Sequence, residues 1–463
     1  MSSAMIKKLY SKKLIQKSFF AHGISVDKNN KLSIDTKAWT YYNLGMYKTV
    51  ANLSANGLKT KGLLAKIVSH AACGDFDTAK ILIHSFQEQK DSISYTTLLA
   101  DALSPYMPHE ALALISITKP EPLYSAILLK LEQRETAFER LYALIQDKSY
   151  RKKPEVLLYY SNAKETISNT EKVRYLNMYL NLFNIPKIKL IDKTKELSVI
   201  NISLDYHEKI VDGPLVSIIM TSFNTGERIG TAIESILKQS YQNIELIIVD
   251  DASSDDTQDI ITAWKHKDER IQTIVLEKNV GTYVAKNIGL KISQGEFITC
   301  HDSDDWSHPL KIERQVLPLI KNKHLVASIS SWIRLDDFGR YYARPVHPLA
   351  RQNPSSLMFR KKIVLEKAGV WDSVRTGADS EFIARLRIIF GRKNITKIKE
   401  VLAFGAHREN SLMTAQDTGY CHMGMSPKRL EYWELWNKWH IHMLSNKKQP
   451  KLNSDQIQDF FGK

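Results

Sequence analysis

The sequence predicts an all-helical N-terminal region followed by an α/β domain built on a mostly parallel sheet. Between residues 45 and 200, apolar residues recur at helical spacing, and short breakers separate the runs. From residue 212 onward, apolar runs typical of buried strands alternate with helices of about ten residues, which is the pattern of a doubly wound sheet. A chain of 463 residues is long enough for two or three domains of ~150 residues.

The first 200 residues are predicted to form two segments. Residues 1–44 form a basic helical segment, and residues 45–200 form an irregular array of helix pairs similar to tetratricopeptide repeats. Arrays of this kind usually bind partners, so we expect a protein partner or an oligomer contact here. The helices predicted for the array are Leu63–Ala72, Thr78–Phe86, Thr97–Leu103, Glu110–Ile117 and Tyr124–Leu131.

The α/β domain is predicted over residues 212–425, and residues 426–463 follow it as a helix and a tail. Its strands are nearly continuous apolar runs, as burial on both faces of a parallel sheet requires. The predicted strands are Leu215–Met220, Glu245–Val249, Ile271–Leu276 and Glu296–Cys300. The helices predicted between them are Gly230–Gln239, Asp255–Trp264 and Thr282–Ser293.

Two of the loops that follow these strands are rich in carboxylates. Because ligands bind beyond the carboxyl ends of the strands in such sheets, we expect both loops in one site. Neighbouring carboxylates need a cation or a donor ligand, and hard oxygen ligands suit Mg²⁺ or Mn²⁺. The plainer alternatives are a solvated acidic turn and helix capping by Ser254 or Asp255. The carboxylates are Asp250 and Asp251 in one loop and Asp302, Asp304 and Asp305 in the other.

Missing motifs exclude several other classes of protein. The sequence lacks the GxxxxGK motif of a P-loop, and no GxGxxG motif of a dinucleotide-binding site follows the first strand. The HExxH and GxSxG motifs are also absent. Cys73, Cys300 and Cys421 are far apart, which argues against a CxxC zinc site and a disulfide framework. No run approaches the ~18 apolar residues that cross a bilayer.

The positive charge is concentrated in the N-terminal part of the sequence. The formal net charge is +15, and residues 1–200 hold 29 basic and 18 acidic residues, against 36 and 32 in residues 201–463. Because this excess is remote from the carboxylate loops, nucleic-acid binding is disfavoured. A basic face attracts anionic lipid or acidic glycan, so peripheral contact with an anionic membrane is one interpretation. An ordinary solvated surface, or a basic helix packed on its own domain, is the alternative.

Several motifs in the α/β domain resemble, in order and spacing, those of family 2 glycosyltransferases. The resemblance covers residues 214–412 and implies a GT-A fold, a nucleotide-sugar donor and inversion at the anomeric carbon. The motifs are Val216–Asn224, Asp250–Ser253, Asn279–Gly281, Ala285–Gly289, Gly295–Glu296 and His301–Asp305.

The resemblance also implies which residues bind the donor. Asp304 would bind Mn²⁺ or Mg²⁺ with Asp302 and His407, and Lys286 replaces a usual arginine, so it keeps the charge without the bidentate fork. His301 replaces a residue that is usually apolar. The residues implied to contact the nucleotide-sugar are Thr221, Phe223, Asn224, Asp250, Asp251, Asn279, Gly281, Lys286, Asp302 and Ser303.

The catalytic base implied by the resemblance is Asp379, which would deprotonate the acceptor hydroxyl. Ala378 stands where the family has glutamate, and Glu381 is the fallback base. For Asp379 the plainer alternative is a carboxylate at the start of a helix. The further residues that the resemblance suggests for the acceptor and for the late His/Arg loop are Trp306, Trp371 and Arg408.

An aromatic stripe follows the α/β domain. Tyr432, Trp436 and Trp439 are spaced so that they lie on one face of a helix within Leu430–Leu444. Packing against the transferase core is the expected role, and docking at a headgroup layer is the alternative.

The sequence therefore predicts a metal-dependent, inverting glycosyltransferase that uses a UDP-sugar. Its expected acceptor is a glycan or a lipid-linked glycan of a bacterial capsule, lipopolysaccharide or other envelope polysaccharide. The expected location is the cytoplasm, with peripheral attachment to the inner face of the membrane. A nucleotidyltransferase and a non-catalytic binding module with a degenerate transferase domain remain the alternatives.

Overall fold

The computed structural model describes residues 32–409, 411, 414, 419–421 and 424–453. Most of the predicted basic segment, residues 1–31, lies outside the described residues, and so does the end of the predicted tail from residue 454. No helix in the described part of the chain is long and apolar enough to cross a membrane.

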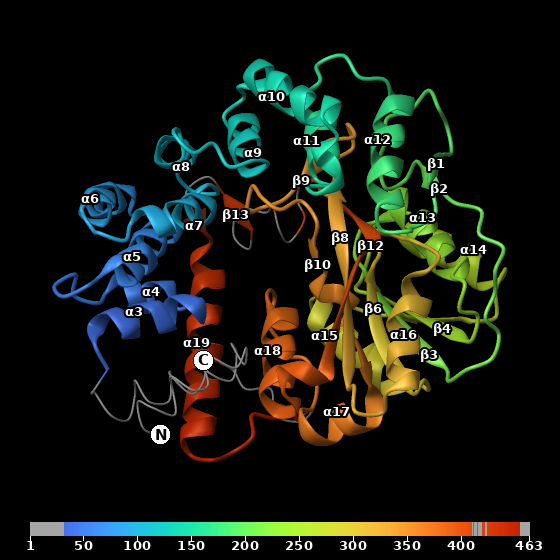
Figure 1. The fold of residues 1–463 in the computed structure, drawn as a ribbon. Coiled ribbons are helices and arrows are strands. Elements are labelled where there is room, and N and C mark those ends of the chain that lie inside the picture. Colours follow the sequence, from blue (N-terminus) through green and yellow to red (C-terminus); the bar gives the residue numbers. More distant parts are fainter. Residues whose placement is uncertain (1–31, 410, 412–413, 415–418, 422–423, 454–463) are drawn as a thin grey trace.

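The predicted helical region is present and forms an arc of sequentially packed helices (Figure 1). Each helix buries one apolar stripe; in α6, for example, Asp75 caps the helix by accepting from Thr78 N, and Leu82 and Phe86 lie in the core. The helices are α3 (Ile34–Asn43), α4 (Tyr47–Ala51), α5 (Thr60–Ala72), α6 (Phe76–Gln87), α7 (Ile93–Leu103), α8 (Pro108–Leu114), α9 (Leu123–Lys130), α10 (Arg134–Gln146), α11 (Val156–Ala163) and α12 (Asn169–Asn181).

The region predicted as all-helical also contains a small antiparallel sheet. Strand β1 (Lys189–Leu190) pairs with β2 (Ile202–Ser203) after the last helix of the arc. The Asn201 side chain holds the intervening turn, because it donates to the carbonyls of Asp192, Lys195 and Glu196. Two-residue strands have no periodicity, so the sequence pattern does not reveal them.

The second region is a mixed sheet in the order β5-β4-β3-β6-β11-β8-β12-β7. The four predicted strands are confirmed and run parallel, while β11 is antiparallel to both of its neighbours. The strands are β3 (Val216–Ser222), β4 (Ile244–Asp250), β5 (Ile271–Val275), β6 (Phe297–Asp302), β7 (Trp306–Ser307), β8 (Ala327–Leu335), β11 (Met358–Arg360) and β12 (Ile395–Ala406), with β9 (Tyr341–Tyr342) and β10 (Arg351–Gln352) paired to β8.

Helices cover both faces of this sheet because side chains alternate along each strand. Ile218 and Ile248 face the core shared with α13 (Gly226–Leu237) and α16 (Lys311–Lys321). Ile219 faces the opposite core. The helices of that second face are α15 (Thr282–Ile292), α17 (Lys361–Lys367) and α18 (Ala378–Phe390), and α14 (Thr257–Lys265) packs beside α13.

Helix α19 (Pro427–Ser445) lies between the helical arc and α18 (Figure 1). On one side Glu434 accepts from Thr49 N and Oγ1, and Asn437 Nδ2 donates to the Leu44 carbonyl. Tyr432 and Trp436 of the aromatic stripe are 1% and 3% exposed. The expected packing role is therefore confirmed for these two side chains.

On its other side, α19 meets a buried ionic network on α18. Arg385 donates from Nε and Nη2 to the two oxygens of Glu381, and His440 Nε2 lies 2.9 Å from Glu381 Oε1. All three side chains are 0% exposed. Arg385 Nη2 also donates to the Val370 carbonyl, which ties α18 to the segment that precedes it. The network thus links α19, α18 and that segment.

We predict that Arg385→Met lowers the free energy of unfolding by about 3–5 kcal/mol, because it leaves the Glu381 carboxylate buried without its main counter-charge. Thermal unfolding followed by circular dichroism measures the effect. The control is Lys238→Met, which removes the exposed pair with Glu234 and should cost less than about 1 kcal/mol. Equal unfolding midpoints for the two variants would contradict the prediction.

Candidate functional site

The carboxyl ends of the parallel strands bring the predicted loops together. In the sheet register, Thr221 on β3 pairs with Val249 on β4 and with Asp302 on β6. Ser222 pairs with Asp250. The two carboxylate loops therefore lie at one edge, as the sequence predicts.

The carboxylate oxygens of Asp250 are hydrogen-bonded mainly within its own loop. It is 1% exposed, and its oxygens accept from the side chains of Ser222, Ser253 and Gln258 at 3.1, 2.5 and 2.9 Å. Ser253 N donates to it as well. These bonds assign Asp250 to holding the loop after β4, and its contact with a nucleoside base stays a prediction.

Asp251 joins two of the loops. Its carboxylate accepts from Val280 N at 2.7 Å and Gly281 N at 2.8 Å, and it is 3% exposed. Asn279 Nδ2 donates to the Asp251 carbonyl. Gly281 has a φ of +90°, a conformation that side chains with a Cβ rarely adopt. The segment Asn279–Gly281 is therefore fixed against Asp251 at the start of α15.

The first turn presents an exposed aromatic ring. Phe223 is 46% exposed beside Asn224, which has a φ of +50°. Asn224 Oδ1 accepts from Ser254 N, and Asn224 N donates to Ser253 Oγ. Below the turn, Thr221 Oγ1 lies 2.7 Å from Thr282 Oγ1. The predicted donor residues of this turn thus lie next to the loop that contains Asp250 and Asp251.

The Asp302–Asp305 turn places two of its carboxylates in partly exposed positions. Asp302 Oδ2 accepts from Ser355 Oγ at 2.8 Å, and Asp304 Oδ2 accepts from Arg408 Nε at 2.8 Å. Ser303 is buried, and its Oγ accepts from Thr225 Oγ1. The turn therefore directs Asp302 and Asp304 away from the core.

Asp305 points into the protein instead. Burial, together with the charges of Asp304 and Asp302, raises the pKa of its carboxyl well above the usual value. It accepts from Ala406 N at 3.0 Å, which fixes the turn to the end of β12. Asp305 is therefore a structural residue of the turn.

A buried His–Lys pair lies under the same turn and gives a structural reason for His301. His301 Nε2 lies 3.2 Å from the Asp305 carbonyl, and Lys311 Nζ lies 3.4 Å from His301 Nδ1. Burial and the Lys311 charge lower the pKa of His301, and burial lowers the pKa of Lys311 to about 8. Lys311 thus adds positive charge beneath an acidic turn, which no motif indicated.

The donor set of the turn fits a divalent metal only in part. Asp302 and Asp304 each keep one oxygen without a hydrogen bond to the described residues, and such oxygens suit Mg²⁺ or Mn²⁺. No three His, Cys, Asp or Glu side chains come together as a metal site within the described residues. The predicted third ligand, His407, is stacked on Tyr342 with centroids 3.6 Å apart and does not group with Asp302 and Asp304 in this structure.

Asp379 opens α18 and contacts a buried lysine. Lys286 Nζ lies 3.2 and 3.0 Å from the two Asp379 oxygens, and Tyr283 Oη donates to Oδ2 at 3.4 Å. Lys286 is 2% exposed and the Asp379 side chain 13%. Burial opposes the ammonium charge, yet Asp379 and Asp302 together raise the pKa of Lys286 above its usual value. Lys286 therefore pairs with the candidate base Asp379, and the charge of Asp302 acts on it as well.

Three predicted site residues are buried away from this edge. Glu381 is 0% exposed and paired with Arg385 and His440, so it is not a fallback base. Trp371 is 2% exposed and packs edge-to-face on Phe359. Trp306 is 4% exposed and lies in the core shared with the helical arc. Neither indole is available to stack on a sugar.

Sequence reasoning missed three residues of the site. Arg375 is exposed and donates to Asn279 Oδ1, and its side chain lies over Gly281. The Ser355 hydroxyl donates a hydrogen bond to Asp302, and the Tyr283 hydroxyl donates one to Asp379. Of these three, only Tyr283 could have been found from the sequence. It lies one helical turn before Lys286, so the two side chains are expected on the same face of the helix.

The segment before α18 is supported by α19. Tyr432 Oη donates to Asp372 Oδ2 at 2.9 Å, and the Tyr432 ring lies against Gly377, where an added Cβ would be 3.2 Å away. Asp372 is 3% exposed, and burial raises the pKa of its carboxyl to about 6. Tyr432 thus positions the turn from which Asp379 projects.

The comparisons with known proteins agree with this architecture. Residues 217–377 match the family model described as "Glycosyl transferase family 2". The match includes the carboxylate loops and Lys286 and ends two residues before Asp379. Together with the mostly parallel sheet and its covering helices, the match confirms the predicted GT-A-type domain and the resemblance to family 2.

Relatives resemble only part of the chain. It is 46% identical over 102 residues to the UDP-Glc:alpha-D-GlcNAc-diphosphoundecaprenol beta-1,3-glucosyltransferase WfaP of Escherichia coli, covering 22% of this chain and 40% of that protein. It is 43% identical over 91 residues to the glycosyltransferase GlyG of Streptococcus pneumoniae, covering 20% of this chain and 30% of that protein. The chain spans less than half the length of the curated relatives it matches.

Among solved structures, S. aureus TarS 1–349 in complex with UDP-GlcNAc is similar at 16% identity and a TM-score of 0.36. That alignment covers 50% of this chain and 72% of the TarS chain.

We predict that Asp372→Asn stabilises the protein at pH 7.5 but not at pH 4. The folded pKa of about 6 exceeds the unfolded value of ~3.9, so ionisation destabilises the folded state increasingly from about pH 4 to pH 6 and fully above it. Asparagine removes this cost and still accepts from Tyr432. The shift of about two pKa units corresponds to ~3 kcal/mol at most. Thermal unfolding at the two pH values measures it.

The control is Asp259→Asn on the exposed face of α14, which should change stability by less than about 0.5 kcal/mol at either pH. A gain for Asp372→Asn that is equal at pH 4 and pH 7.5 would show that ionisation of Asp372 is not its cause.

Proposed function

The chain carries a family 2 glycosyltransferase domain, and we propose that it transfers a sugar from a UDP-sugar to a glycan hydroxyl with inversion at the anomeric carbon. The observation that carries this proposal is the ion pair of Asp379 with the buried Lys286, together with the Asp302–Asp305 turn that follows β6. A carboxylate base beside a diphosphate-binding turn is what direct displacement at a sugar carbon needs.

In the proposed reaction, the acceptor oxygen forms a bond to the anomeric carbon. The bond from that carbon to the β-phosphate oxygen breaks, its electron pair leaves with the nucleoside diphosphate, and the acceptor proton passes to Asp379. Lys286 and Tyr283 hold the Asp379 carboxylate from one side, so its orientation is fixed before the acceptor binds.

The protein groups proposed to bind the donor lie around the turn after β3. Phe223 offers an exposed ring on which a base stacks, and Asp251 and Thr221 lie beside it. Arg375, over Gly281, is available for a phosphate. A UDP-sugar is also the donor in the name of the relative WfaP.

We propose that Asp302 and Asp304 hold Mn²⁺ or Mg²⁺ together with the donor diphosphate. When bound, such a metal supplies positive charge for the departing diphosphate. Arg408 engages Asp304 and so lies where it also reaches the leaving group.

The proposed acceptor is a glycan, free or lipid-linked, in the synthesis of a bacterial envelope polysaccharide such as capsule or lipopolysaccharide. The name of WfaP specifies a diphosphoundecaprenol-linked acceptor, which supports this class. A nucleotidyltransferase is disfavoured, because the turn after β3 has no free basic side chain: Arg228 is paired with Asp337.

We predict that Asp379→Asn lowers kcat by at least about 10²-fold, because the base is lost while the shape is kept. Asp304→Asn should abolish the extra thermal stabilisation that Mn²⁺ adds to UDP binding, because one of two metal carboxylates is lost. UDP release from a panel of UDP-sugars with a matched acceptor measures the first effect, and thermal shift measures the second.

Asp259→Asn on α14 is the control and should leave both readouts unchanged. If Asp379→Asn and Asp304→Asn transfer sugar at the wild-type rate, the catalytic roles given to these two residues fail. If the wild type transfers sugar from none of the donors, a binding module is the better assignment.

We also propose that the protein attaches peripherally to the inner face of the cytoplasmic membrane through its basic N-terminal sequence. The lysines before residue 18 precede the first acidic residue, Asp27, and an anionic surface attracts such a segment. We predict that the protein sediments with membranes at low salt and leaves them at high salt, where charge is screened. A chain found wholly in the supernatant at low salt would contradict this.

A further inference from the structure

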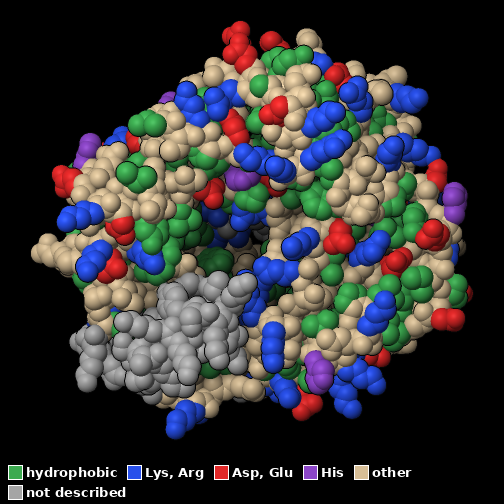
Figure 2. Space-filling model, viewed as in Figure 1, with side chains coloured by type: hydrophobic (Ala, Val, Ile, Leu, Met, Phe, Trp, Pro, Cys, Tyr) green, Lys and Arg blue, Asp and Glu red, His purple; other side chains and the backbone are tan. Residues whose placement is uncertain are grey.

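A cavity of about 420 Å³ lies where the helical arc, α18, α19 and the β8–β10 edge meet. Figure 2 shows the molecule hollowed between the helical arc and the sheet domain, with lysine or arginine side chains along the hollow. A volume of this size suits a sugar-sized ligand. The end of α3 and the following residue, Asn43 and Leu44, form part of its wall.

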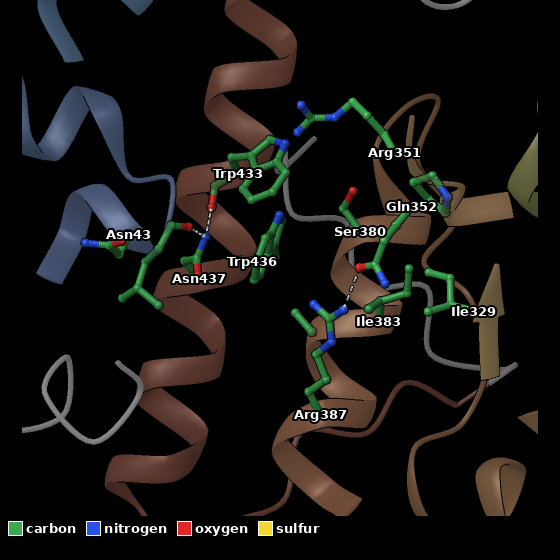
Figure 3. A pocket seen from close by; sticks show the side chains of 13 residues that line it. Asn43, Ile329, Arg351, Gln352, Ser380, Ile383, Arg387, Trp433, Trp436 and Asn437 are labelled. Carbon is green, nitrogen blue, oxygen red and sulfur yellow. Dashed lines mark hydrogen bonds between the residues drawn. The ribbon is translucent and has the colours of Figure 1, made fainter. Parts of the chain in front are cut away.

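The α19 wall of the cavity is aromatic. Trp433 and Trp436 project from α19 towards α18 (Figure 3), with ring centroids 5.0 Å apart. Gly45 packs against Trp433, since an added Cβ would lie 2.8 Å from the ring. Flat aromatic surfaces of this kind pack on the apolar faces of sugar rings. The helical arc therefore fixes one of the indoles.

The facing wall is cationic. Arg387 projects into the cavity from α18 and Arg351 from β10 (Figure 3). Arg387 Nη2 lies 3.4 Å from Gln352 Oε1, and Arg351 is exposed and has no ion pair closer than 4 Å among the described residues. No carboxylate is among the described residues that line the cavity. Two guanidinium groups without a lining counter-charge favour an anionic ligand.

Unpartnered polar atoms mark the same cavity. Trp436 is 3% exposed and its Nε1 is buried without a hydrogen bond to the described residues; Asn437 is 0% exposed and its Oδ1 is likewise unpaired. Gln352 Nε2 is a third such atom. Buried donors and acceptors in native proteins normally have partners. A bound molecule with hydroxyl groups would supply them.

The cavity also lies next to the candidate base. Ser380, which immediately follows Asp379, lines it together with Ile383 and Arg387 on one face of α18. The cavity therefore begins at the residue that follows the candidate base on α18, whose own carboxylate contacts Lys286.

We propose that this cavity binds an anionic saccharide as the acceptor: a sugar ring on Trp433, which is only half-buried, with its phosphate or carboxylate on Arg351 and Arg387. The assignment of the bound saccharide as the acceptor rests on the proposed function. The binding of an anionic saccharide in the cavity does not depend on catalysis. It also gives the helical arc a role, because the arc completes the acceptor site.

Isothermal titration of the full chain, without donor, tests the proposal. The probes are N-acetylglucosamine 1-phosphate and glucuronic acid, with N-acetylglucosamine and inorganic phosphate as the neutral and sugar-free controls. At least one anionic sugar should bind about 10-fold more tightly than both controls, and the preferred one identifies the anion as phosphate or carboxylate.

Arg351→Gln and Trp433→Ala should each weaken this binding by about 10-fold, the loss typical of one charge-assisted hydrogen bond or one aromatic contact. Arg351 is exposed, so its variant should fold normally. Arg151→Gln, an exposed arginine on the outer surface of the arc, is the matched control.

Two outcomes overturn the proposal: neither anionic sugar binds better than the controls, or Arg351→Gln binds as tightly as Arg151→Gln. UDP binding measured on the same variants separates this failure from a failure of the proposed function, because Arg351→Gln should leave UDP affinity unchanged.

Discussion

The concentration of aspartates at one edge of the sheet is the constraint on which the site depends. Strand register alone places Asp250, Asp251 and Asp302 there, and like charges at that spacing repel. The fold offsets each charge differently. Asp250 and Asp251 are saturated by hydroxyl, amide and backbone donors, while Asp304 and Asp379 face the cations Arg408 and Lys286. Asp302, Asp304 and Asp379 are the carboxylates of this edge that are left partly exposed, and they are the ones to which chemistry is assigned.

The position of Asp379 depends in turn on α19. Tyr432 supports the turn before α18, and the Glu381–Arg385–His440 network fastens α18 to α19. Because Thr49 binds Glu434 on the far side of α19, the helical arc and the candidate base are connected through a single helix. Fully buried ion pairs have directional bonds that apolar packing lacks. They therefore fix the rotation of α18 about its own axis as well as its distance from α19.

Much of the fold followed from local pattern, because buried parallel strands and amphipathic helices have distinct periods. The short strands β7 and β11 lacked a period and were not predicted. The same limit applied to the site. Position in a motif grouped Asp302 with Asp304, and both are partly exposed in one turn. It could not distinguish Asp379, which opens a helix towards Lys286, from Glu381, which is two residues later and faces His440. Packing between distant segments decides the rotation of a helix about its axis. The spacing of residues in the sequence does not determine that rotation.

The distribution of charge along the sequence also failed to predict where the cationic cavity lies. The basic excess lies in residues 1–200, which suggested that anions meet the helical half. Yet the arginines of the cavity, Arg351 and Arg387, come from the half with little net charge, and the helical half contributes neutral wall residues. Net charge averages over groups that cancel in pairs, whereas an anion responds to cations left without a pair inside a wall of low polarity. An anion site is therefore sought among guanidinium groups that lack carboxylate partners, and the net charge of a domain says little about it.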